Sequence, residues 1–291
     1  MADDVPPELL RCPFPTRRAL ARVARHELES SGRYRRVGYG AWMVADEGDS
    51  YGRRIQGVLS RQRQQPVLLG PSAAWAHGCR HADPHEHVHV AGRARTGRDL
   101  VRHPTALDPG DVVATPMGPA TSLERTAVDL ARGIGTAHLD HLGRVTWVDA
   151  LLRATGLVAV RARSGLIPAA GLRGLDQARL VLRAARDGVD SPKETELRLL
   201  VVGAGFPEPQ TQCPVVLGGR IVARLDLGWP DHRAGLEYDG AVHLERRQHS
   251  WDLDRHNAIR AACWRVLQAD QRLLDRPADL LARLALVVPR S

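Results

Sequence analysis

Apolar and polar positions near the start of the chain form short periodic segments separated by turn residues. Over 16–30, Leu20, Val23 and Leu28 stand at helical spacing with arginines on the opposite face, which predicts an amphipathic helix. Residues 34–45 are rich in aromatic and β-branched side chains and are broken by glycines, which predicts one or two short strands. A basic helix followed by a β-hairpin is the outline of a winged-helix unit.

The middle of the chain is predicted to mix helices and strands. Helical patterns cover 52–62, 71–78, 121–133, 139–152 and 175–185, and strand patterns cover 66–69 and 85–90. Thr121 and Glu124 stand at the spacing of a capping box, which places the start of that helix at Thr121. Glycines and Pro168 predict loops over 158–174.

The region after residue 187 has the clearest order of elements. Residues 187–192 are dense in turn formers and predict a domain boundary. Ser191 and Pro192 supply an N-cap and a first helical position, and Glu194 is able to close a capping box. Further on, Gly218-Gly219 separates two β-type segments, which predicts a two-residue hairpin turn.

The second strand of this hairpin alternates apolar with polar residues. Its polar face carries Asp226, and its apolar face carries Ile221, Ala223, Leu225 and Leu227. A turn over 228–233 leads to the strand over 234–240, which carries Glu237. Antiparallel pairing through that turn brings the two carboxylates to one face of the sheet.

Two convergent carboxylates, together with a backbone carbonyl, form an oxygen-ligand site that suits Mg²⁺ or Mn²⁺. Such an ion neutralises phosphate charge and activates water for phosphodiester hydrolysis. The alternative is that Asp226 and Glu237 are acids at a sheet edge, where charge discourages pairing with another strand.

Composition favours a soluble globular protein. The 291 residues are 43% hydrophobic and 25% charged, a length that suits two domains. No apolar run reaches the ~20 residues that span a bilayer, and the N-terminus has no apolar segment of a secretory signal. The four cysteines are far apart and form no CxxC pair. We therefore expect a cytoplasmic protein with free thiols and no membrane partner.

The net charge of +8 is unevenly distributed. Residues 190–291 carry 14 Lys+Arg and 14 Asp+Glu, so the whole excess lies in residues 1–189. Such clustering favours a polyanion such as DNA. The alternative is a solvated arginine-rich surface, since the chain has a single lysine, Lys193. The candidate DNA contacts in the N-terminal region are Arg17, Arg18, Arg22, Arg25, Arg35 and Arg36.

The C-terminal region contains the runs LDLGWPDHRAGLEYDGAVH and WDLDRHNAIRAACWRVLQ. They resemble a family of uncharacterised endonuclease-like domains, of the PD-(D/E)XK superfamily, that is related to the very-short-patch repair endonuclease. The family pattern is an acid, a turn, Glu-x-Asp-Gly-x-x-His and an Asp-Arg helix before a Trp-Arg-Val strand. The match spans roughly 191–269 and includes Asp226, Glu237, Asp239, Gly240, His243, Asp254, Arg255, Asn257, Trp264, Arg265 and Val266.

The resemblance implies that Asp226 and Glu237 hold the metal ion and that Glu194 is the upstream acid, with Glu196 in reserve. Glu194 is equally well explained as a capping residue. The superfamily's lysine falls at Asp239, so that role is vacant. His243 is the candidate for it, as a general base or a phosphate contact, and the alternative is a structural histidine.

Further positions bear on activity. Arg247 and Arg255 are candidate phosphate contacts, although surface arginines are often simply solvated. Cys263 stands where the family has a helix-ending glycine, and Gln268 stands where an arginine often follows the strand. These departures indicate a diverged member.

The N-terminal region contains GRYRRVGYGAWMVA, PSAAWAHG and TSLERTAVDLARG. These motifs, over about 16–185, resemble the AbiEi-type antitoxin of type IV toxin–antitoxin systems, which implies DNA binding and transcriptional autoregulation. Nearby, several zinc-ligand side chains occur without the spacing of a zinc finger: His77, Cys79, His81, His85, His87 and His89.

Taken together, the sequence predicts an α/β protein with a winged-helix-like segment over 1–65, an α+β middle region over 66–188 and a restriction-endonuclease-like α/β domain over 189–291. That last domain has a central mixed sheet flanked by helices. The leading hypothesis is a DNA-directed endonuclease that uses Mg²⁺ or Mn²⁺, with His243 or a water bound to the metal as base. The alternative is a DNA-binding regulator whose nuclease-like domain is inert and serves as a binding or homodimerisation module. A zinc-stabilised scaffold is a third possibility.

Overall fold

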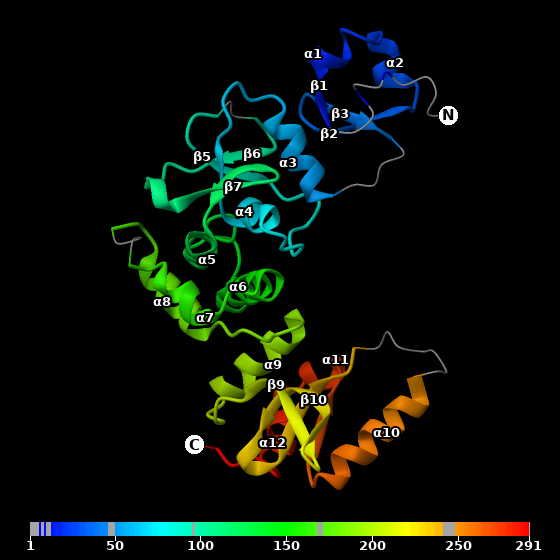
Figure 1. Ribbon diagram of the computed structural model, residues 1–291, viewed down its shortest axis with the longest axis vertical. Coiled ribbons are helices and arrows are strands. Elements are labelled where there is room, and N and C mark those ends of the chain that lie inside the picture. The colour runs from blue at the N-terminus through cyan, green and yellow to red at the C-terminus, as the bar shows by residue number, and fades with distance from the viewer. Residues whose placement is uncertain are drawn as a thin grey trace. The chain divides into compact units, whose positions relative to one another are not determined.

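The computed structural model describes Pro6, Leu9 and residues 13–45, 50–94, 97–167, 171–240 and 248–290, with the side chains of 248–253 outside the description. The chain is an α/β protein with mixed sheets, as the sequence predicts. It divides into two compact units, Met1–Arg183 (unit 1) and Ala184–Ser291 (unit 2) (Figure 1). No helix in the described part of the chain has the length and apolarity to cross a membrane.

Unit 1 begins with a small sheet and two short helices. The prediction of a single helix over 16–30 is therefore wrong. The elements are β1 (Phe14–Pro15), α1 (Thr16–Ala19), α2 (Arg25–Ser30), β2 (Tyr34–Gly38) and β3 (Ala41–Val44), and the strand order is β1-β3-β2 with antiparallel pairing. The helix breaks at 20–24 because Ala19, Val23 and Leu28 then enter one apolar core, while Leu20 stays exposed.

The rest of unit 1 surrounds a five-stranded mixed sheet of order β6-β5-β4-β8-β7. Its strands are β4 (Val67–Leu68), β5 (Val88–Ala91), β6 (Leu100–Arg102), β7 (Val112–Thr115) and β8 (Gly118–Thr121). Its helices are α3 (Tyr51–Leu59), α4 (Gly70–Ala76), η2 (Pro109–Asp111), α5 (Leu123–Ala131), α6 (His141–Thr155), α7 (Ala159–Ser164) and α8 (Leu175–Ala184).

Three local predictions in unit 1 are wrong. Helix α5 is capped by Ser122, whose side chain accepts from the Arg125 N–H, because Thr121 is the last residue of β8. The strand expected over 85–90 begins only at Val88. The segment expected to form loops over 158–174 contains the helix α7.

A buried ionic network joins α5 to η2, the short helical turn before β7. The Arg125 guanidinium lies 2.5 Å from Asp111 Oδ2 and 3.2 Å from Asp129 Oδ1, and Arg132 lies 2.8 Å from the same Asp129 oxygen. Because Arg125 is 3% exposed and Asp129 is fully buried, each charge depends on its partners for solvation.

Unit 2 has one four-stranded sheet of order β12-β11-β10-β9. Its strands are β9 (Gln210–Leu217), β10 (Arg220–Trp229), β11 (Ala234–Tyr238) and β12 (Arg265–Ala269), antiparallel except for the parallel pair β11–β12. Its helices are α9 (Pro192–Gly203), η3 (Pro230–His232), α10 (Gln248–Ala261), α11 (Gln271–Leu274) and α12 (Pro277–Leu284). Figure 1 shows α10, in orange, beside the yellow strands β9 and β10.

Local sequence explains the centre of unit 2. Both Gly218 (φ 58°) and Gly219 (φ 77°) adopt positive φ, as a type I′ hairpin turn requires. The alternation predicted for β10 is confirmed from Ala223 to Leu227, where Ala223, Leu225 and Leu227 are buried and Arg224 is exposed. Ile221, predicted for the apolar face, is exposed, because the register shifts between Ile221 and Ala223. Ser191 caps α9 as predicted, accepting from the Glu194 N–H at 3.2 Å. These elements position the carboxylates of the candidate site.

Candidate functional site

Strands β10 and β11 bring Asp226 and Glu237 next to each other. Leu227 pairs with Leu236 in the antiparallel register, so Asp226 and Glu237 occupy the next opposing positions. Side chains of opposing residues lie on the same face of a sheet, about 5 Å apart at their Cβ atoms. The face predicted from the alternation is therefore the one on which both carboxylates lie.

Asp226 is a half-buried carboxyl in an unfavourable electrostatic position. Its Oδ2 accepts from the Tyr238 N–H at 2.8 Å. The pKa of Asp226 is raised to about 6, chiefly by burial; the negative charges of Glu194 and Glu237 also raise it, whereas the Tyr238 hydrogen bond and Arg255 lower it. A raised pKa means that the negative charge of this carboxylate is unfavourable in its surroundings, and a bound cation would stabilise that charge.

Glu194 approaches this pair from α9. It is 7% exposed, and burial is the main cause that raises its pKa. Its Oε2 accepts from the Asp190 N–H at 2.8 Å and lies 3.5 Å from Gln212 Nε2. Glu194 thus accepts from the residue before the N-cap, in place of the Ser191 N–H that a capping box would use. Glu196, the reserve candidate, pairs with Lys193 at 2.8 Å.

Arg255 on α10 holds Glu237 with two donors. Its Nη1 lies 3.3 Å from Glu237 Oε2, and its Nη2 donates to Glu237 Oε1 and, at 3.0 Å, to the carbonyl oxygen of Arg224. Both carboxylate oxygens of Glu237 therefore have a guanidinium partner. The sequence proposed Arg255 as a phosphate contact, and this ion pair is a role that sequence reasoning missed.

The strand registers place a polar residue on each strand of the sheet at the level of these acids. Continuation of the β9–β10 register sets Gln212 opposite Asp226, and Glu237 pairs with Gln268 on β12. Gln268 Nε2 lies 3.2 Å from His256 Nε2 on α10. Gln212 also has a positive φ of 46°, which is uncommon outside glycine. The alignment of these four residues across the sheet depends on the strand registers, so it could not be predicted from the sequence pattern of any one strand.

Asp239 lies beyond the end of β11 and is exposed. Its backbone N–H donates to the Ala269 carbonyl at 2.8 Å. Its side chain lines an open hollow of about 340 Å³ with Gln268, Asp270, Arg272, Leu273, Arg276, Asp279 and Arg283. The two other residues predicted for this site, His243 and Arg247, lie outside the described residues.

The histidine-rich segment forms separate contacts. Among the residues that the structure describes, no group of three or more His, Cys, Asp or Glu side chains is arranged to hold a metal ion, either in this segment or around Asp226. His77 Nε2 is 2.7 Å from the Thr121 carbonyl, and His81 packs edge-on against Trp147. Only His89 lies in β5, because His85 and His87 precede the strand.

His89 belongs to a buried polar cluster of unit 1. Its Nδ1 lies 2.9 Å from His103 Nε2, and its Nε2 lies 3.4 Å from Glu86 Oε1. Burial, together with the charges of His89 and Arg132, lowers the pKa of His103 to about 4. His103 is therefore neutral near pH 7.

The basic N-terminal region presents most of its arginines to solvent. The exposed ones are Arg17, Arg18, Arg22, Arg25 and Arg36, whereas Arg35 is half-buried. The Arg36 guanidinium stacks over Trp42 at 4.9 Å, and Arg25 pairs with Glu29 at 3.2 Å. The exposure is compatible with a polyanion partner.

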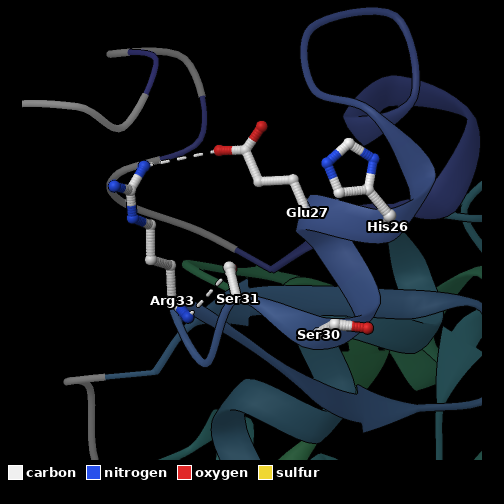
Figure 2. A pocket seen from close by; sticks show the side chains of 5 residues that line it. All are labelled: His26, Glu27, Ser30, Ser31 and Arg33. Atoms are coloured by element: carbon white, nitrogen blue, oxygen red, sulfur yellow. Dashed lines mark hydrogen bonds and ion pairs between the residues drawn. The ribbon is translucent and has the colours of Figure 1, made fainter.

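A shallow hollow of about 630 Å³ lies beside α2. It is lined by His26, Glu27, Ser30, Ser31 and Arg33. Figure 2 shows the Arg33 guanidinium directed at Glu27, 3.5 Å away, and the Arg33 N–H donating to Ser31 Oγ at 3.1 Å. These interactions fix the turn after α2. They assemble no catalytic group, so the carboxylates of unit 2 remain the candidate site.

Comparison with known proteins adds distant relatives only. No family model matches the chain, and no solved structure matches it. Two uncharacterised proteins, from two strains of Mycobacterium tuberculosis, are each 32% identical to it over 174 residues, which is 59% of this chain and 62% of the relative. The chain thus spans less than two thirds of the length of the curated relatives that it matches.

Proposed function

We propose that the protein is a cytoplasmic, DNA-directed endonuclease that hydrolyses phosphodiester bonds with Mg²⁺ or Mn²⁺. The observation that carries the proposal is the placement of Asp226 opposite Glu237 on adjacent strands of unit 2, where burial, and after it repulsion from Glu194 and Glu237, raises the pKa of Asp226. A structural role does not require several acids at one partly buried point of a sheet. The helix–hairpin–strand–helix–strand order of unit 2 is also that expected of the endonuclease-like family.

The donor set suits a hard divalent cation. Proteins often bind Mg²⁺ through one or two carboxylates, with waters and substrate phosphates completing the coordination, so a cage of three protein ligands is not required. Asp226 and Glu237 would hold the ion, and Glu194 would add negative charge beside them. When bound, the ion neutralises phosphate charge and makes water a stronger nucleophile.

The remaining residues have roles that the proposal assigns by chemistry. Glu194 and Gln212 order the site beside Asp226 through their 3.5 Å contact. His243 stays the candidate general base, because an imidazole exchanges a proton near neutral pH. The exposed arginines of unit 1 would bind DNA phosphates without reading sequence.

A second function is favoured by one observation, the Arg255–Glu237 ion pair. If this guanidinium is the permanent partner of Glu237, the site is inert. The protein is then a DNA-binding regulator, related in function to the AbiEi-type antitoxins, with unit 2 as a binding or homodimerisation module. The vacant lysine position at Asp239 is consistent with this alternative.

Cleavage assays separate the two functions. Plasmid, linear, single-stranded and T:G-mismatched DNA are incubated with Mg²⁺ or Mn²⁺ and the wild type, Asp226→Asn, Glu237→Gln or the control Asp231→Asn. Asp231 is an exposed acid of the same unit, outside the cluster. The nuclease requires cleavage by the wild type and the control that falls at least 100-fold in the other two. DNA binding without cleavage of any substrate favours the regulator.

A further inference from the structure

Glu237 already has a cationic partner in the candidate site, the guanidinium of Arg255. It contacts both Glu237 oxygens and the Arg224 carbonyl oxygen, so it is placed over the joined edges of β10 and β11. Charge-assisted contacts of this two-donor kind are the strongest that an arginine makes with a carboxylate. The Arg255 side chain is nevertheless 31% exposed, while that of Glu237 is 12% exposed.

A divalent ion at Glu237 needs the same oxygen lone pairs that now accept from Arg255. The two cations would also repel each other strongly at such a separation in a partly buried site. Occupation of Glu237 by Arg255 and occupation by a metal ion are therefore competing states. The exposed fraction of Arg255 gives the guanidinium access to solvent, where a replacement partner can reach it.

A phosphodiester is the replacement partner with matching chemistry. Its oxygens accept from a guanidinium in the same two-donor geometry as a carboxylate does, and arginine is suited to both. A DNA phosphate near the site would therefore compete with Glu237 for Arg255. Each guanidinium that turns to phosphate leaves a carboxylate free for the ion.

We propose that Arg255 and a divalent cation bind Glu237 in mutual exclusion, and that a DNA phosphate releases Arg255 so that DNA and the cation bind cooperatively. The inference rests on the proposed function, since it assumes DNA as the ligand. By thermodynamic linkage, DNA must tighten metal binding by the same factor by which metal tightens DNA binding. Without DNA, the site would hold little metal and cause no unwanted cleavage.

The test measures Mn²⁺ affinity by electron paramagnetic resonance with and without a short duplex. The full-length chain is used as wild type, Arg255→Gln, Arg255→Lys and the matched control Arg260→Gln, an exposed arginine of the same helix. Glu237→Gln supplies the blank for Mn²⁺ bound by the DNA itself. We expect Arg255→Gln to bind Mn²⁺ at least tenfold more tightly than the wild type without DNA, with no further gain from DNA.

The other variants sharpen the result. The wild type and Arg260→Gln should gain affinity when DNA is added, and Arg255→Lys should lie between wild type and Arg255→Gln because it keeps the charge but loses the two-donor geometry. Thermal melting checks that each variant is folded. If Arg255→Gln fails to fold, Arg255→Lys alone decides, since unchanged or weaker Mn²⁺ binding in that variant would overturn the inference.

The outcomes also separate this inference from the proposed nuclease. Tighter Mn²⁺ binding by Arg255→Gln, with no DNA cleavage by any form, supports the exclusion and rejects the nuclease. Cleavage by the wild type with equal Mn²⁺ affinity in Arg255→Gln rejects the exclusion and retains the nuclease. Absence of Mn²⁺ binding in both forms, with and without DNA, rejects both.

Discussion

Replacing Asp226 by asparagine should stabilise unit 2 at neutral pH. The folded-state pKa of Asp226 is about 6, against 3.8 for the unperturbed group. Because it lies above the unfolded value, the stability that this carboxyl contributes is fully present below pH ~4 and is lost as the pH rises through about 6. Asparagine keeps an acceptor for the Tyr238 N–H and removes the charge.

The magnitude follows from the pKa difference. A difference of one in pKa corresponds to about 1.4 kcal/mol, so the full effect would approach about 3 kcal/mol above pH 7. Solvent screens the half-exposed side chain, and we expect roughly 1–2 kcal/mol. At pH 4 most of the difference between Asp226→Asn and the wild type should be gone.

Hydrogen exchange of the full-length chain in EDTA, read by mass spectrometry, measures the opening free energy of the β10 and β11 peptides. The wild type, Asp226→Asn and the control Asp231→Asn are compared at pH 7.5 and pH 4. Equal or lower protection of Asp226→Asn at pH 7.5 would refute the reasoning, because the carboxylate would then carry no electrostatic cost. A gain that is the same at both pH values would point to a cause other than ionisation.

Three further changes test other parts of the structure. Gly228→Ala should destabilise unit 2 by about 1–3 kcal/mol in urea denaturation, because its Cβ would stand 2.4 Å from Cys213 Cβ; an unchanged midpoint would contradict this packing. Arg125→Met should cost about 3–5 kcal/mol in thermal melting of unit 1, since it leaves Asp111 buried without its cation and Asp129 with Arg132 as its remaining partner, and Arg161→Met, at an exposed position, serves as control. The folded protein prefers neutral His103, because its pKa is lowered to about 4, so the wild type should lose unit 1 stability as the pH falls from about 6.5 to about 4. His103→Gln should show a smaller loss over this pH range. An identical pH profile in wild type and variant would exclude His103 as the cause.

Local signals in the sequence predict the framework of unit 2 well. Ser191 starts α9 by accepting a hydrogen bond from the N–H of Glu194, three residues further along the chain, and Pro192 suits the first helical position. Gly218-Gly219 forms the hairpin turn because few other residue pairs accept two positive φ angles. Alternation in β10 then places Asp226 on the polar face. Each of these features depends on neighbours along the chain.

Predictions failed where distant residues decide the outcome. The helix over 16–30 is broken in the structure, and residues from both sides of the break pack in one core with Leu9 and Phe14, which lie outside the predicted helix. Thr121 has capping chemistry, but its hydroxyl bonds Thr126 Oγ1 at 2.8 Å, and the cap passes to Ser122. The pairing of Arg255 with Glu237 depends on how α10 packs on the sheet, which no local pattern reports.

The topology of unit 2 also sets the order in which its parts should form during folding. Strands β9 and β10 are joined by a two-glycine turn, whereas the parallel pair β11–β12 must close a long connection that contains α10. Closing a long loop costs more entropy than closing a hairpin, so contacts of low sequence separation tend to form earlier. The hairpin should therefore belong to the folding nucleus, and the Glu237–Gln268 pairing should be gained late. In a partly folded chain Asp226 would already face Glu237, because the short turn over 230–233 joins β10 to β11, and only the contact of Glu237 with β12 would await the last cooperative step.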